Sequence, residues 1–217
     1  MISSKRGSEV SSAEVLSLYA GAAEIPSATL HEACGQIGAL PSCIKPVATS
    51  FKLCGPAVTV HGPGGDNLWI HRAIYAAKAG DVLVVYVSDV YEHGYWGEIM
   101  SIAAKARNLG GLVIDGCVRD IEQLEQIGFP IFSRGLCIAG TSKNPVSKGR
   151  INEPLLIGKA QIKPGDLIVG DRDGVVAIPK EQVEKTLTAA TSREATEATI
   201  QRRLISGESS LAIYGWT

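Results

Sequence analysis

Two nearly continuous apolar runs constrain the fold of this chain most. AGDVLVVYVS (79–88) and GLVIDG (111–116) each open on a glycine turn, and each leads into a polar loop followed by a helical pattern. An apolar run of this length without alternation is typical of a strand buried on both faces, as in a parallel sheet covered by helices. The pattern therefore predicts an α/β fold in which strands and helices alternate.

Caps, turns and apolar periodicity in the rest of the sequence predict the other helices and strands. Helices are predicted over 9–22, 27–35 (with Ser27 or Thr29 as cap), 66–78 (capped by Asp66), 98–108, 121–127 and 180–206. Further strands are predicted over 56–61 and 130–135, and a hairpin over 164–179 with Asp173-Gly174 as its turn. The hairpin makes the sheet mixed. Residues 141–160 are polar and strand-poor, and we find no linker, so a single domain over 1–217 is expected.

Composition excludes several classes of function. The chain has 217 residues, 45% of them hydrophobic and 20% charged, with a formal net charge of −1 and no long basic run. This balance disfavours electrostatic binding to nucleic acid or to anionic membranes. The longest apolar runs are too short to span a bilayer, and the N-terminus lacks a signal-peptide core, so a cytoplasmic protein is expected. The five cysteines show no CxxC pair and are interpreted as idle thiols of a reducing compartment: 34, 43, 54, 117 and 137.

The segment from 97 to 100 is the first candidate site. In α/β sheets, ligands bind beyond the carboxyl ends of parallel strands, where loops open after Ser88 and Asp115. Gly97 comes directly before a predicted helix, which runs through an apolar stripe at Ile99, Ile102, Ala103 and Ala106. Free backbone amides at such a start suit a carboxylate or phosphate, and Glu98 can hold a metal. The alternative is that Gly97 is a plain cap and Glu98 complements the helix dipole.

The second candidate is the adjacent pair Arg119 and Asp120. Asp120 stands where a helix N-cap is expected, and Gln123 would complete a capping box. The functional alternative gives Asp120 the role of a hard oxygen ligand for Mg²⁺ or Mn²⁺. Arg119 would then offer its planar donor fork to a substrate carboxylate or a developing oxyanion. One carboxylate at a helix start can fill both roles.

Other polar residues are weaker candidates. His93 is the one histidine expected near this crevice, although a structural role is favoured for it. Asp115 either faces the crevice or satisfies turn amides. The glycine turn 64–67 lacks the remainder of a phosphate-binding motif. Glu194 and Glu197 interrupt the apolar line of the last helix; they are either solvated at its edge or face a neighbouring subunit.

Five segments taken together resemble one known family. The chain is similar to the 4-hydroxy-4-methyl-2-oxoglutarate / 4-carboxy-4-hydroxy-2-oxoadipate aldolases, class II pyruvate aldolases of the RraA-like superfamily. The resemblance runs in order over most of 25–215, and its most specific part is the WGE…VIDGxVRD stretch. The segments are ATLHEACGQIGAL (28–40), GPGGDNLWIHRAIYAAKAGDVLVV (62–85), HGYWGEIMSIAAKARNLGGLVIDGCVRD (93–120), GFPIFSRG (128–135) and KPGDLIVGDRDGVVAIP (163–179).

The resemblance implies a fold and a site. It implies a three-layer α/β domain of the swivelling type with a long C-terminal helix, assembled as trimers or hexamers with sites between subunits. It implies Mg²⁺ or Mn²⁺ with Asp120 as the direct protein ligand and Glu98 in the water shell of the metal. The amides of Ile99 and Met100, with Gly97 before them and Arg119 beside them, would hold the pyruvyl unit. Glu197 would complete the metal environment from an adjacent subunit.

The resemblance also implies a reaction, and it leaves one alternative function open. The expected reaction is metal-dependent retro-aldol cleavage of a 4-hydroxy-2-oxo acid with a second carboxylate, giving pyruvate and another oxo acid. Decarboxylation of oxaloacetate is an expected side activity. One departure is Gln123, since aldolases of this group often carry an acidic residue there. The rival is a regulator that binds a ribonuclease without catalysis, as in another branch of the superfamily.

Overall fold

A mixed eight-stranded sheet forms the centre of the molecule. The computed structural model describes Tyr19 and residues 21–216, so the predicted helix over 9–22 lies mostly outside the described residues. The sheet has the order β1-β7-β5-β3-β2-β12-β13, with β9 added beside β2; the run β7-β5-β3-β2 is parallel. The bounds are β1 (Lys45–Pro46), β2 (Leu53–His61), β3 (Val82–Tyr86), β5 (Gly111–Asp115), β7 (Ile131–Ser133), β9 (Arg150–Ile151), β12 (Leu167–Asp171) and β13 (Gly174–Ile178).

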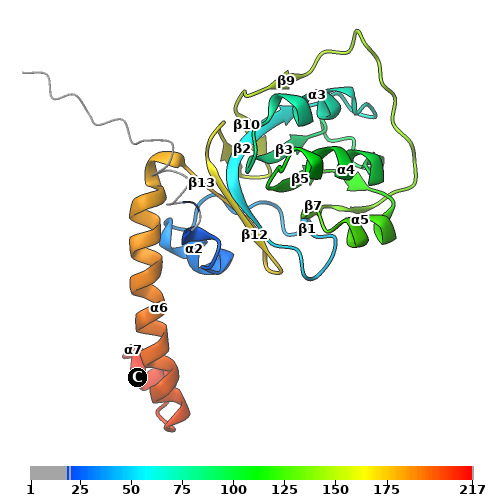
Figure 1. Cartoon of the computed structure of the whole chain (residues 1–217). Helices are drawn as coiled ribbons and strands as arrows, with labels where there is room; N and C mark the ends of the chain where they lie inside the picture. The colour runs from blue at the N-terminus through cyan, green and yellow to red at the C-terminus, as the bar shows by residue number, and fades with distance from the viewer. Residues whose placement is uncertain (1–18, 20, 217) are drawn as a thin grey trace, which may run out of the picture.

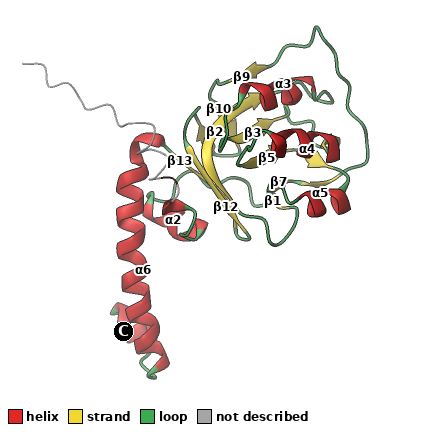
Figure 2. Cartoon of the chain, viewed as in Figure 1, coloured by secondary structure: helices red, strands yellow, loops and turns green. Residues whose placement is uncertain are grey.

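Helices cover the two sides of this sheet, as Figures 1 and 2 show. Three of them, α3, α4 and α5, connect the parallel strands and lie together, whereas α2 packs against β12 and β13 and α6 packs against α2. The second half of α6 leaves the body as an arm, with α7 folded back at its end (Figure 1). The bounds are α2 (Ser27–Ala33), α3 (Leu68–Ala76), α4 (Glu98–Ala106), α5 (Ile121–Ile127), α6 (Val183–Ile205), α7 (Ser210–Tyr214) and the 3₁₀ turn Lys180–Gln182. The predicted α/β class with a mixed sheet is therefore confirmed.

The two apolar runs are the central strands. Every residue of β5 is buried, and in β3 only Tyr86 is partly accessible. Both faces of these strands are covered, which is why neither run alternates polar and apolar residues. Among the described helices, none has the length and apolarity needed to cross a membrane.

A second, small sheet carries the functional region, and the sequence did not predict it. It pairs β4 (Gly94–Trp96), β6 (Cys117–Val118) and β8 (Gly135–Leu136) in parallel. β4 lies inside a segment predicted to be a polar loop, because a strand of three residues is too short to show periodicity. A third sheet, β10 (Leu155–Ile157) with β11 (Ala160–Ile162), lies mainly in the stretch predicted to be strand-poor.

Three local predictions were wrong. The apolar stripe of α4 faces solvent, with Ile99 73% and Ile102 49% exposed, while Met100, Ser101 and Ala104 face the core. The tight turn of the hairpin is Arg172-Asp173, because Gly174 already pairs with Asp171. The cap of α2 is Pro26 rather than Ser27 or Thr29.

Asp171 explains the failed prediction for α2. Its Oδ1 accepts the hydroxyl of Ser27 at 2.6 Å and its Oδ2 accepts the Ser27 amide at 2.8 Å, so the cap comes from a distant strand. Burial raises the pKa of Asp171, but the hydrogen bonds from Ser27, Asp173 and Gly174 outweigh it and lower the pKa overall. A lowered folded-state pKa stabilises the protein above the unfolded-state value.

We expect Asp171→Asn to destabilise the protein at pH 7 by about 1 kcal/mol, since an amide nitrogen would face backbone donors at a partly solvated site. The difference between variant and wild type should shrink as pH falls below about 4, through the folded-state pKa. Urea unfolding at several pH values measures both effects. A difference that stays constant down to pH 2 would show that the charge of Asp171 contributes nothing.

Candidate functional site

A pocket of about 200 Å³ lies where α4 begins, between the ends of β4 and β6. Its lining includes Gly97, Glu98, Ile99, Met100, Arg119 and Asp120. The two predicted candidate segments therefore meet in one pocket. They are brought together by the small sheet, in which Trp96 pairs with Val118 and the amide of Arg119 donates to the carbonyl of Trp96 at 2.9 Å.

Asp120 does not cap its own helix with its side chain. It occupies the N-cap position of α5 but has a left-handed backbone with φ 65°, and its side chain makes no capping hydrogen bond. Its Oδ2 instead accepts the amide of Glu98 at 3.0 Å, at the start of α4. The capping-box interpretation with Gln123 is therefore wrong. A positive φ costs a non-glycine residue about 1 to 2 kcal/mol, and such strain often marks a functional position.

Arg119 lies beside this carboxylate with its guanidinium open to the pocket. Its Nε is 3.8 Å from Oδ2 of Asp120, and the two side chains are 47% and 38% exposed. This distance makes a loose ion pair, so both groups keep capacity for a ligand. The guanidinium can offer two parallel donors to a planar carboxylate or oxyanion.

Two glycines leave space for the side chains of Arg119 and Asp120. The sequence analysis did not predict that either glycine is needed for steric reasons. A Cβ built on Gly97 would lie 2.2 Å from Oδ2 of Asp120. A Cβ on Gly94 would lie 2.5 Å from the carbonyl oxygen of Cys137 and 2.9 Å from Cδ of Arg119. Gly97 has φ −156°, an extended backbone, so its role is close approach rather than conformational freedom.

The start of α4 supplies backbone donors to the same pocket. The amide of Glu98 is used by Asp120, whereas those of Ile99 and Met100 lie in the first turn, where the helix has no acceptors for them. Ile99 and Met100 both line the pocket; the side chain of Ile99 is exposed and that of Met100 is buried. This arrangement favours an anionic ligand group near the helix start.

Four further side chains line the pocket, and sequence reasoning assigned none of them to it: Asn67, His71, Tyr95 and Lys143. Asn67 is 5% exposed; its Nδ2 donates to the carbonyl of Tyr95 at 2.9 Å, and its Oδ1 has no hydrogen-bond partner among the described residues. The pKa of His71 is lowered, first by burial and then by the positive charge of Lys143. His71 is therefore a neutral hydrogen-bonding group at pH 7.

Four predicted candidates do not reach this pocket. His93 is outside its lining, although the next residue, Gly94, belongs to it; the ring of His93 packs against Tyr95, and its buried Nδ1 finds no partner in the described chain. Asp115 is buried and ion-paired to Arg134 at 2.6 Å, so it does not line the pocket either. Glu197 bonds Arg193 at 2.8 Å and, like the exposed Glu194, lies on the arm of α6. Its expected reach to a neighbouring subunit stays a prediction.

The glycine turn 64–67 has a structural role. Its Gly65 amide donates to the hydroxyl of Tyr95 at 2.7 Å, and Oδ1 of Asp66 accepts the Leu68 amide at 2.9 Å. The second oxygen of Asp66 binds Ser142 and Asn144. These amides are satisfied within the protein, which removes the interpretation of the turn as a phosphate site.

The donor set fits a hard divalent cation with few protein ligands. Of the two carboxylate oxygens of Asp120, Oδ2 accepts a hydrogen bond from the described chain and Oδ1 accepts none, so Oδ1 is available to a cation. Glu98 adds a second carboxylate to the lining. No cluster of three His, Cys, Asp or Glu side chains occurs among the described residues. Mg²⁺ and Mn²⁺ suit such a site, because Mg²⁺ binds through one or two carboxylates and keeps several waters.

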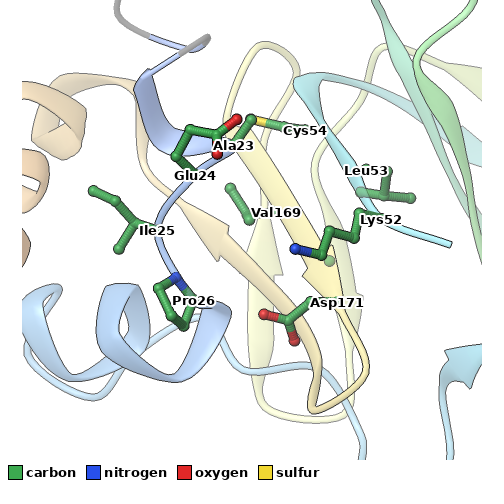
Figure 3. Close-up of a pocket in the computed structure, with 10 residues that line it drawn as sticks. Ala23, Glu24, Ile25, Pro26, Lys52, Leu53, Cys54, Val169 and Asp171 are labelled. Carbon is green, nitrogen blue, oxygen red and sulfur yellow. The ribbon is translucent and has the colours of Figure 1, made fainter. Parts of the chain in front are cut away.

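A second hollow, of about 180 Å³, lies between β12 and the segment before α2 (Figure 3). The side chains of Lys52 and Asp171 lie on one side of it, and Cys54 on another. The carboxylate of Asp171 is already bound by Ser27, and the thiol of Cys54 donates to the carbonyl of Tyr19. Burial raises the pKa of Cys54 to about 11, so the thiol is not an active nucleophile. The hollow offers no reactive set of groups.

Comparison with known proteins identifies the family. The family model described as "RraA-like: Aldolase/RraA" matches residues 23–177, which include the whole pocket. A protein of Halalkalibacterium halodurans named "Putative 4-hydroxy-4-methyl-2-oxoglutarate aldolase" is 38% identical over 83% of this chain and 85% of its own.

Two solved structures share the fold. An uncharacterized protein of Pseudomonas syringae pv. tomato has a TM-score of 0.79 at 27% identity, and 96% of each chain is covered. A Streptomyces coelicolor protein, titled an unusual member of the RNase ES inhibitor RraA protein family, has a TM-score of 0.75 at 24% identity. That match covers 85% of this chain and 96% of the other and concerns the fold alone.

Proposed function

This chain belongs to the RraA-like family, and from that premise we propose that it is a divalent-metal-dependent carbon–carbon lyase. The proposed substrate is a 4-hydroxy-2-oxo acid with a second carboxylate, cleaved to pyruvate and a second oxo acid. One observation supports this proposal above the others: the strained backbone of Asp120 turns its carboxylate away from its own helix and toward the start of α4, beside Arg119.

Different residues of the pocket would bind the metal, the carboxylate and the 2-oxo oxygen. Asp120 would hold Mg²⁺ or Mn²⁺ with Glu98 nearby, and the cation would supply Lewis-acid polarisation of the 2-oxo group. The amides of Ile99 and Met100 receive the carboxylate of the pyruvyl unit. Arg119 donates to the 2-oxo oxygen, where negative charge develops as the enolate forms.

The cleavage itself moves one proton and one electron pair. Glu98 takes the proton of the C4 hydroxyl through an intervening water, and the C4 oxygen forms its double bond to carbon. The C3–C4 bond breaks, and its electrons pass into the enolate of pyruvate, whose charge Arg119 balances. Glu98 returns the proton through the water to C3, and pyruvate is released. Oxaloacetate gives the same enolate by losing CO₂, so its decarboxylation belongs to the same proposal.

The proposal includes an assembly. We expect a homotrimer, or a hexamer of two trimers, in which Glu197 on the arm of one subunit approaches the pocket of another. The arm leaves its own body in Figure 1, and Ile99 and Ile102 present an apolar surface next to the pocket. Exposed apolar surface of this kind is typical of interfaces.

The test of the function is pyruvate release by protein stripped with EDTA and then supplied with Mg²⁺ or Mn²⁺. We expect release from 4-hydroxy-4-methyl-2-oxoglutarate or 4-carboxy-4-hydroxy-2-oxoadipate only after the metal is restored. Oxaloacetate serves as a third substrate. If all three stay intact with either metal, the lyase proposal is wrong.

A second candidate is a regulator that binds a ribonuclease. It is favoured by the exposed Leu136 (57%) and Ile138 (95%) beside Arg119, which suit a protein partner, and the description of the matching family model names both aldolase and RraA. Capture of a purified ribonuclease by the wild type, undiminished by EDTA, would support this candidate. The lyase and the regulator differ in their need for metal, so one set of proteins tests both.

A further inference from the structure

The small sheet that carries the site continues from the main sheet. The chain passes from β3 to β4, from β5 to β6 and from β7 to β8, and the three strands have the same order in both sheets. One residue, Gly116, separates β5 from β6, and one residue, Arg134, separates β7 from β8. The amide of Arg134 donates to the carbonyl of Gly116 at 3.0 Å, so these two bends lie side by side.

The side chain of Arg134 joins all three connections between the two sheets. Its Nε lies 2.6 Å from Oδ1 of Asp115, the last residue of β5. Its guanidinium carbon lies 3.7 Å from the ring centroid of Tyr91, in the loop between β3 and β4. A guanidinium over an aromatic ring is attracted by the π electrons of the ring. Arg134 therefore contacts the chain just before each strand of the small sheet.

Both partners of Arg134 are held in turn. The side chain of Asp115 is 2% exposed, so this ion pair is largely shielded from water. The Tyr91 hydroxyl donates to Oδ1 of Asp89 at 2.5 Å, and the Tyr86 hydroxyl, at the end of β3, donates to Oδ2 at 2.8 Å. The backbone of Asp89 is left-handed, with φ 60°. Such a conformation persists only where surrounding contacts hold it, so the network fixes the loop before β4.

The strands that follow these bends carry the groups of the site. β6 leads into Arg119 and Asp120, and β4 leads into the start of α4. The Arg119 amide donates to the carbonyl of Trp96 at 2.9 Å, and the Cys137 amide donates to the carbonyl of Val118 at 2.9 Å. Each strand of the small sheet has only two or three residues, so few hydrogen bonds within it oppose a change of angle at the bends.

We propose that Arg134 is a positioning residue for the reaction: it fixes the small sheet on the main sheet and thereby sets Arg119 and Asp120 against the start of α4. This inference rests on the proposed lyase function. Arg134 does not line the pocket, so it acts only through the strands that it holds. A displacement of about 1 Å at a catalytic group is enough to slow a reaction by orders of magnitude.

The test measures kcat and KM for pyruvate release separately. We expect Arg134→Met to lower kcat by about tenfold or more with KM within about threefold, because the transition-state contacts are misaligned while the α4 amides still bind the carboxylate. Arg134→Lys keeps a cation beside Asp115 and Tyr91, and its kcat should stay within about threefold of wild type. Arg150→Met is the matched control: it removes an exposed arginine whose ion pair with Glu153, at 3.0 Å, lies outside the small sheet, and it should leave kcat unchanged.

A double variant separates positioning from stability. Arg134→Met/Asp115→Leu replaces the buried ion pair with two apolar side chains, a change that commonly costs little stability or none. We expect this double variant to unfold at a temperature close to that of wild type and still to show the low kcat of Arg134→Met. Recovery of the wild-type kcat would overturn the inference, since the pair would then serve stability alone.

Hydrogen exchange tests the same inference without the reaction. In Arg134→Met the amides of Arg119 and Cys137 should exchange about tenfold faster than in wild type, while those of β3 and β5 stay protected and Arg150→Met changes neither. If the wild type releases pyruvate and Arg134→Met matches its kcat, the inference is overturned while the lyase stands. If the wild type releases no pyruvate, the lyase fails and exchange alone decides: faster exchange confined to the small sheet supports the role of Arg134, and unchanged exchange overturns it.

Discussion

Asp120→Ala is expected to lower kcat/KM for pyruvate release by about 1,000-fold. Asp120 is the proposed direct protein ligand of the metal, and Lewis-acid activation is worth several kcal/mol, at about 1.4 kcal/mol for each factor of ten. Its carboxylate also holds the start of α4 through the Glu98 amide at 3.0 Å, so the variant also loses this hydrogen bond. Steady-state kinetics at saturating Mg²⁺ measure the loss.

The effect of Asp120→Ala on the stability of the fold must be separated from its effect on catalysis. The backbone of Asp120 has φ 65°, which asparagine and glycine tolerate better than alanine. Asp120→Asn and Asp120→Gly should therefore unfold at a higher temperature than Asp120→Ala but remain as inactive. If Asp120→Asn keeps more than a third of wild-type kcat/KM, the carboxylate is not the metal ligand.

Gly97→Ala is expected to lower kcat/KM by about 100-fold while the protein remains folded. The added Cβ would lie 2.2 Å from Oδ2 of Asp120 and 3.3 Å from Cγ of Arg119, so the pair must move away from α4. Misplacing a catalytic group by about 1 Å commonly costs a factor of this size. The extended backbone of Gly97 is open to alanine, so steric contact alone causes the effect.

The matched control is Gly21→Ala, where no atom of the described residues, chain neighbours aside, lies within 4 Å of the new Cβ. We expect it to keep full activity. Thermal unfolding of both variants should stay close to that of the wild type. Activity of Gly97→Ala within threefold of wild type would mean that the close contact between Gly97 and Asp120 is not needed for turnover.

The layout of the main sheet could be predicted because its signals are local. The strands β3 and β5 are almost wholly apolar and lie between glycine turns, so their burial was evident from composition alone. α5 ends at Gly128 in a left-handed conformation, as its sequence indicates. For α4 the helix was right and the buried face was wrong, since Ile99 and Ile102 are exposed beside the pocket.

The site could be predicted only where its residues follow strand ends. Arg119 and the start of α4 were predicted in this way. The sequence around Asp120 fits a helix cap equally well, and only the backbone conformation of Asp120 shows that its side chain does not cap α5. Lys143 could not be found, because its loop is held by contacts between Asp66 and residues more than 70 positions away. Such contacts leave no periodic signal in one sequence.

The central claim is that one pocket, formed by α4 and Asp120, holds the metal and the pyruvyl unit together. The most direct test is a crystal soaked with Mn²⁺ and pyruvate, in which the anomalous signal locates the metal. The account predicts one strong peak in direct contact with the Asp120 carboxylate, with pyruvate lying between that peak and Arg119. A peak elsewhere, or pyruvate bound away from Arg119, would contradict it.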